Sequence, residues 1–207
     1  MKTLLRSFDV RQHELRRTVQ MDLYRGADKT NAEHIARDWT AWFDQAPGAQ
    51  DEHWEWDDKL FRAEDDPLLF DVFVLEAEGT TQALMLVMKG GLKCSSLHPD
   101  HPRAPLVYVD LVATAPWNRR AKADPIRFKG CGQVMIATAV SLSFDEGFKG
   151  RVGLHSLSDS EGFYRHRIGM TEFPPDPNYQ NLRYFELSES QAAAFVTNQP
   201  STKGGRP

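Results

Sequence analysis

Residues 106–144 read LVYVDLVATAPWNRRAKADPIRFKGCGQVMIATAVSLSF, and this stretch decides the predicted fold. Residues 106–114 are nearly all apolar or β-branched, which predicts a buried strand, and Pro116 ends it. Residues 132–144 are apolar on most sides, which predicts a helix buried against a sheet. The loop that joins them is basic and contains Arg119, Arg120, Lys122, Arg127 and Lys129.

Further strands are predicted on both sides of this unit. Runs of apolar and β-branched residues predict strands at residues 69–75, 83–88, 151–157 and 182–187. Residues 159–168 predict a helix that Gly169 ends. The elements therefore predict a mixed α/β fold.

The first third of the chain predicts helices. One helix is predicted from a capping box of Asp9 with Gln12. Its apolar positions follow at four-residue spacing: Leu15, Val19 and Leu23. A second helix is predicted from Thr30 with Glu33. Its core-facing stripe lies at i, i+4, i+7 and i+8: Ile35, Trp39, Trp42 and Phe43.

Length and composition indicate one domain. The chain has 207 residues, 41% of them hydrophobic, which suffices for a substantial core. We expect a single domain at residues 1–197, with a helical part at 1–68, a core at 69–187 and a flexible tail at 198–207. The formal net charge of −4 argues against general electrostatic binding of nucleic acid.

Cysteine content and hydropathy indicate in which cellular compartment the protein is expected. Cys94 and Cys131 form neither a disulfide framework nor a metal quartet, and no His or Cys set has metal-ligand spacing, so we expect no metal. The start MKTLLRSFDV has no signal-peptide core, and no apolar run approaches the roughly 20 residues of a membrane span. We therefore expect a soluble, cytoplasmic protein.

The start of the buried helix predicts an anion site. Gly130 and Gly132 allow the backbone to approach a ligand, and free amides at a helix N-terminus attract phosphate. The stretch is neither a Walker loop nor a dinucleotide fingerprint, because neither glycine pattern is complete. A tight turn with solvated charges is the alternative interpretation.

Two motifs carry a resemblance to a known family. Residues 127–132, RFKGCG, fit the pattern R/Q-x-x-G-x-G/A, and residues 163–170, FYRHRIGM, resemble F/L-Y-x-x-x-G-F/M. Their order around a strand and a helix resembles the GCN5-related N-acetyltransferases over residues 69–187. The chain departs from that pattern in a longer loop at residues 118–127 and in Leu157, where the family often has asparagine.

The resemblance implies a fold and an activity. The implied fold has a central mixed, mostly antiparallel sheet flanked by helices. The implied activity is direct transfer of an acetyl group from acetyl-CoA, a co-substrate, to a primary amine. We expect the backbone along the central strand to bind the pantetheine arm and polarise the carbonyl, at Leu111, Val112, Ala113 and Thr114. We expect the pyrophosphate to be bound at Arg127, Phe128, Lys129, Gly130, Cys131, Gly132 and Gln133.

The resemblance also implies catalytic residues. Tyr164 matches the tyrosine that commonly protonates the leaving thiolate. Asp110 and His155 are the two candidates for the base that takes the proton of the amine, directly or through water. Tyr108 lies two residues before Asp110 on the same strand and is expected to share the site. For each of these side chains a purely structural role is the alternative.

The acceptor and the partners stay open at this stage. Trp54 and Trp56 lie among acidic residues and are candidates for an anionic aromatic wall that binds a small cationic amine. A protein amine or an aminoacyl-tRNA is the other acceptor class, and a homodimer is compatible with the sequence. The rival functions are a non-catalytic acyl-CoA-binding module of the same fold and a nucleic-acid-directed protein that uses the basic loop.

Overall fold

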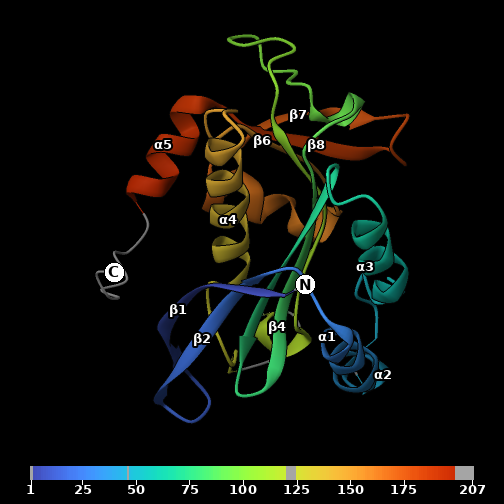
Figure 1. Ribbon diagram of the computed structural model, residues 1–207, viewed down its shortest axis with the longest axis vertical. Coiled ribbons are helices and arrows are strands. Elements are labelled where there is room, and N and C mark those ends of the chain that lie inside the picture. The colour runs from blue at the N-terminus through green and yellow to red at the C-terminus, as the bar shows by residue number, and fades with distance from the viewer. Residues whose placement is uncertain (1, 46, 120–124, 199–207) are drawn as a thin grey trace.

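The computed structural model describes residues 2–45, 47–119 and 125–198, which form a mixed sheet with helices on both faces (Figure 1). The strand order is β1-β2-β3-β4-β5-β6-β8-β7, and only β5 and β6 pair in parallel. The strands are β1 (Thr3–Gln12), β2 (Arg17–Arg25), β3 (Phe70–Ala77), β4 (Thr80–Met88), β5 (Val107–Thr114), β6 (Val152–Ser156), β7 (Thr171–Asp176) and β8 (Leu182–Leu187). The expected mixed, mostly antiparallel sheet is thus confirmed.

Helices cover the two faces of the sheet unequally. On one face lie α4 (Cys131–Asp145) and α5 (Glu189–Thr197), and on the other lie α1 (Lys29–His34), η1 (Ile35–Trp39), α2 (Thr40–Gln45) and α3 (Trp56–Asp65). Alternate residues of β3 point to different cores: Phe73 and Leu75 pack toward α4, whereas Val72 and Val74 pack toward α1–α3. Strands covered on both faces read as continuous apolar runs, which is why β3, β4 and β5 are evident from sequence.

The prediction of a helix after Asp9 is wrong, because residues 3–25 form the β1–β2 hairpin. In β2 the inward positions alternate at Val19, Met21 and Leu23, which is the period of a strand. Leu15, which the four-residue spacing places in a helical stripe, is 58% exposed in the turn. The expected helical part at residues 1–68 therefore begins only at α1.

The start of α1 also differs from the prediction. Asp28, rather than Thr30, caps the helix: its side chain accepts from the Thr30 amide, and Asn31 completes the capping box. The predicted stripe behind it is confirmed at Ile35, Trp39 and Phe43, which are buried against the sheet.

Two elements near the C-terminus were not predicted, namely β7 and α5. In β7 the strand contains Pro174 and Pro175, which weaken a strand signal and are tolerated because β7 is an edge strand. The helix α5 begins at a capping box of Ser188 with Gln191. The tail predicted from residue 198 falls, from residue 199 onward, outside the described residues.

The parallel pair β5–β6 separates after three registered positions. Val107, Tyr108 and Val109 pair with β6, whereas residues 111–114 have registered partners only on β4. Asp110 is the extra residue of a bulge between these two stretches. The two strands thus form a V, and its vertex lies at Asp110.

Candidate functional site

A cavity of about 830 Å³ lies at the open end of this V. Nine of the residues predicted to act in binding or catalysis line it together: Val112, Ala113, Thr114, Lys129, Gly130, Cys131, Gly132, Gln133 and Tyr164. They come from the end of β5, the start of α4 and η5 (Phe163–Ile168), which are distant in sequence. The structure therefore brings the two motifs of the sequence to one cavity.

The start of α4 is shaped by its two glycines. Gly130 caps the helix in the left-handed region with φ of 89°, a conformation that favours glycine. A Cβ built on Gly132 would lie 3.2 Å from the Phe163 ring, so a side chain there would press on η5. Amides at a helix start carry partial positive charge, so this end of the cavity suits a phosphate. Burial raises the pKa of the Cys131 thiol between them, which leaves it protonated.

Three predicted ligand residues are not among those that line this cavity. The Leu111 side chain packs toward α1–α3. Phe128 is buried in the α4 core, and its amide donates to Asn118 Oδ1 at 2.9 Å. The Arg127 guanidinium lies 3.2 Å from Glu14 Oε2 and over the Trp117 ring. Arg120 and Lys122 of the basic loop lie outside the described residues.

Tyr164 lies within the cavity wall. Its side chain packs against Phe163 and Phe185, with ring centroids 5.2 and 5.8 Å away, and only 6% of the residue is exposed. Burial raises the pKa of the Tyr164 hydroxyl, and the nearby Asp51 carboxylate raises it further. The hydroxyl therefore keeps its proton at neutral pH and is available as a donor.

A segment without a recognisable sequence motif closes one side of the cavity. Residues 49–51 join the two arms of the V, and we name them the strap. The Asp51 carboxylate forms a two-point ion pair with Arg119 after β5, at 2.6 and 2.8 Å. The Gln50 side chain donates to Ser158 Oγ and accepts from the Asp159 amide beyond β6. All three strap residues line the cavity.

His155 and Tyr108 lie near the vertex, on β6 and β5. The Tyr108 hydroxyl and His155 Nδ1 are 2.7 Å apart, and His155 Nε2 lies 3.3 Å from Asp176 Oδ2. Burial lowers the pKa of His155, which Asp176 offsets only in part. The imidazole is therefore neutral at neutral pH, and burial raises the pKa of Tyr108 so that it stays a phenol.

Asp110, the other predicted base, is engaged by cations. Its Oδ1 accepts from Lys93 Nζ at 3.0 Å, and its Oδ2 lies 3.6 Å from the Arg62 guanidinium. Lys93 belongs to η2 (Leu92–Cys94), a turn in the loop between β4 and β5. Neither Asp110 nor His155 lines the cavity at the open end of the V.

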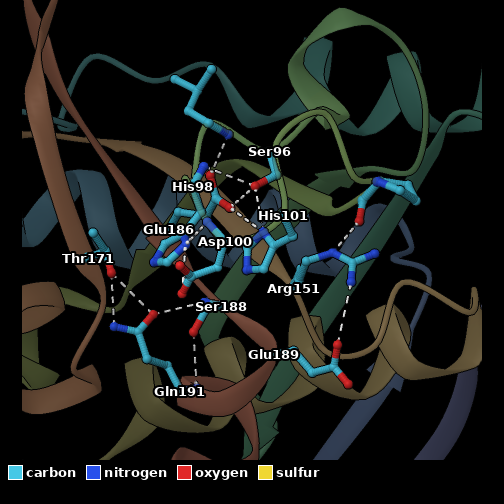
Figure 2. Close-up of polar contacts among 12 residues, drawn as sticks. Ser96, His98, Asp100, His101, Arg151, Thr171, Glu186, Ser188, Glu189 and Gln191 are labelled. Carbon is cyan, nitrogen blue, oxygen red and sulfur yellow. Dashed lines mark hydrogen bonds and ion pairs between the residues drawn. The ribbon is translucent and has the colours of Figure 1, made fainter.

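The loop after Lys93 is anchored to β8 by a buried carboxylate (Figure 2). Glu186 is fully buried and accepts from Ser96 Oγ, the Leu97 amide and the Tyr184 hydroxyl. His101 Nδ1 lies 2.9 Å from the same Ser96 oxygen, and its ring stacks on that of His98. This network fixes the loop between β4 and β5 over the sheet.

The prediction that Trp54 and Trp56 form an aromatic wall for the amine is wrong for Trp56. Trp56 is buried in the core between α3 and the sheet, and Trp54 packs against it edge to face with centroids 6.0 Å apart. The two rings therefore anchor the start of α3 to the core instead of forming an open aromatic surface.

Two further kinds of feature are absent from residues 2–45, 47–119 and 125–198. There, no group of three or more His, Cys, Asp or Glu side chains is placed to hold a metal ion. None of the helices described combines the length and the apolar composition that a membrane crossing requires.

The fold is similar to solved structures, although no protein-family model matches the sequence and no curated protein matches it significantly. The PaiA N-acetyltransferase from Thermoplasma acidophilum, in complex with coenzyme A, has a TM-score of 0.52 and 12% identity, covering 80% of this chain and 97% of that one. The GNAT domain of S. lividans PAT has a TM-score of 0.53 and 10% identity, covering 87% and 96%. At such identities the similarity concerns the fold alone.

Proposed function

We propose that this chain, which has the fold of the GCN5-related N-acetyltransferases, is an acetyl-CoA-dependent N-acetyltransferase. One observation carries the proposal: the splayed end of β5, the glycine-flanked start of α4 and Tyr164 line a single cavity. The acyl donor and the amine would meet at the V, and the acetyl group would pass directly between them.

The cavity fits the donor in size and in chemistry. A cavity of about 830 Å³ is within the range of small-molecule and cofactor sites. The α4 N-terminus would hold the pyrophosphate with the amides of Cys131 and Gly132, and Lys129 would add positive charge. Residues 111–114 of β5 would face the arm with backbone groups that β6 does not pair.

Acetyl-CoA would supply the acetyl thioester, and this chain would move two protons. As the amine nitrogen bonds the carbonyl carbon and the carbon–sulfur bond breaks, Tyr164 would donate its proton to the departing sulfur. The amine proton would pass through the Tyr108 hydroxyl to His155 Nδ1, since these two atoms are 2.7 Å apart. Of the two predicted bases we favour His155, because its neutral imidazole lies 2.7 Å from the Tyr108 hydroxyl, whereas the Asp110 carboxylate is paired with the Arg62 guanidinium.

Ligand binding tests the donor site first. In a thermal-shift experiment, acetyl-CoA and CoA should each raise the Tm of the protein more than ATP does at the same concentration. A ligand at 100 times its Kd stabilises a protein by about 2.7 kcal/mol, which is readily measured. Equal shifts with all three, or no shift with either CoA species, would remove the basis of the proposal. Thiol release with a panel of amines then tests transfer.

The pH dependence tests the base. Only the neutral imidazole accepts a proton, so kcat/KM should fall as the pH drops through the pKa of His155. Because burial lowers that pKa, the acid limb should lie below the ordinary histidine value of about 6.5. His155→Gln should lower the rate and abolish this limb. If the limb persists unchanged in His155→Gln, the base is another group.

A further inference from the structure

The Lys93 ammonium occupies a box of two aromatic rings and a carboxylate. Its Nζ lies 5.0 Å from the centroid of the Tyr108 ring, 4.2 Å from that of Tyr179 and 3.0 Å from Asp110 Oδ1. We name Tyr108, Tyr179 and Asp110 the ammonium box. Rings at such distances attract a cation through their faces, and the carboxylate adds charge and a hydrogen bond.

The ammonium box lies at the vertex of the V. Asp110 is the bulged residue at which β5 leaves β6, and Tyr108 forms part of the last paired stretch. His155 follows Leu154, the last residue of β6 that pairs with β5, and its ring stacks on Tyr179 with centroids 4.2 Å apart. A cation held in the box therefore lies beside the Tyr108–His155 pair that we propose to take a proton from the amine.

Lys93 can leave the box without a rearrangement of the sheet. Its side chain is 31% exposed, and it extends from a short turn outside the strands. A lysine side chain has four rotatable bonds, so rotation within it moves the ammonium by several ångströms. The box would then keep two ring faces and a carboxylate, which together match one primary ammonium group.

We infer that the ammonium box is a binding site for a primary alkylammonium group, and that Lys93 fills it until an acceptor arrives. The acceptor class follows, and this part rests on the proposed function: an unbranched primary alkylamine, such as a lysine side chain or an aliphatic polyamine. Its ammonium takes the place of Lys93 Nζ beside the Tyr108–His155 pair and gives one proton to that pair. Its nitrogen then bonds the acetyl carbon as the carbon–sulfur bond of acetyl-CoA breaks.

Chemical rescue tests the box without using the reaction. Lys93→Ala removes three methylenes and the ammonium, a fragment that n-propylammonium replaces. Adding n-propylammonium should raise the Tm of Lys93→Ala in a saturable way and recover more than half of the loss. The same concentrations of n-propanol or sodium chloride should not. If the variant does not fold alone, the yield of refolded protein is compared instead.

Lys89→Ala is the matched control. Lys89 Nζ binds Asp71 at 2.9 Å and is more buried than Lys93, but it is not part of the ammonium box. Its loss should not be rescued by n-propylammonium. Rescue of Lys93→Ala should also disappear when Asp110→Asn is added. If n-propylammonium raises the Tm of Lys93→Ala no more than that of Lys89→Ala, the inferred ammonium site is contradicted.

Thiol release separates this inference from the proposed function. Lys93→Ala with acetyl-CoA and n-propylamine should release CoA thiol faster than the wild-type protein at low amine concentration. Rescue without thiol release from any amine would support the box and contradict the acetyltransferase. Thiol release from amines without rescue would support the acetyltransferase and overturn the box. If the wild-type protein accepts amines that carry a carboxylate and Lys93→Ala loses activity on them, Lys93 binds that anion and the inferred acceptor class is wrong.

Discussion

Tyr164→Phe should lower kcat by roughly 10²–10⁴-fold, the usual contribution of a positioned acid or base. The change removes only the hydroxyl, which burial keeps protonated beside the cavity. The ring contacts with Phe163 and Phe185 are kept, so the Tm and the Kd for acetyl-CoA should stay close to wild type. Steady-state thiol release measures the rate, and the thermal shift measures binding.

Tyr24→Phe is the control for loss of a phenol. Tyr24 lies on β2, away from the cavity, and its hydroxyl is 3.5 Å from Asp22. Its removal should leave the rate unchanged. A wild-type rate in Tyr164→Phe would assign the acid to another group. CoA binding with no thiol release in the wild-type protein would instead favour the non-catalytic acyl-CoA-binding module.

Glu186→Ala should destabilise the protein by about 3–5 kcal/mol, because each stranded buried donor costs about 1–3 kcal/mol. Three donors lose their acceptor at once: Ser96 Oγ, the Leu97 amide and the Tyr184 hydroxyl. For a chain of this length the expected fall in Tm is roughly 6–20 °C. Denaturant unfolding measures the free energy, and scanning calorimetry measures the Tm.

Glu189→Ala is the control, because it removes a nearby carboxylate that is exposed, whereas Glu186 is buried. Glu189 is more than half exposed, and its ion pairs with Lys149 and Arg151 are 3.5 and 3.9 Å long. Exposed pairs contribute about 1 kcal/mol or less, so this variant should unfold nearly as the wild type does. Equal losses in the two variants would contradict the anchoring role of Glu186.

The fold could be predicted where local pattern and burial agree. The strand β5 and the helix α4 are buried on most sides, and their mostly apolar sequences predict this burial. The hairpin β1–β2 escapes prediction because its apolar residues at positions 15, 19 and 23 have the four-residue spacing of a helix, although Val19, Met21 and Leu23 alternate as in a strand. The helix α5 could have been found, since Ser188 with Gln191 has the spacing of a capping box.

The donor side of the site was predictable, and the acceptor side was not. Gly130, Gly132 and Tyr164 belong to two short motifs, each of which can be read from consecutive residues of the sequence. The strap and the ammonium box depend on contacts between residues far apart in the chain, such as Asp51 with Arg119 and Lys93 with Tyr179. Their local sequence carries no signal of those contacts. A homodimer and a cytoplasmic location stay predictions.

The short pairing of β5 with β6 has a consequence for local stability. Strands β1–β5 form one antiparallel block, β6, β8 and β7 form another, and three registered residue pairs join the blocks within the sheet. Native-state hydrogen exchange should therefore separate two cooperative units, with the amides of the seam opening before those inside either block. A molecule bound across the V would touch both units. Its binding should therefore slow hydrogen exchange most at the paired residues of β5 and β6, and less in the outer strands.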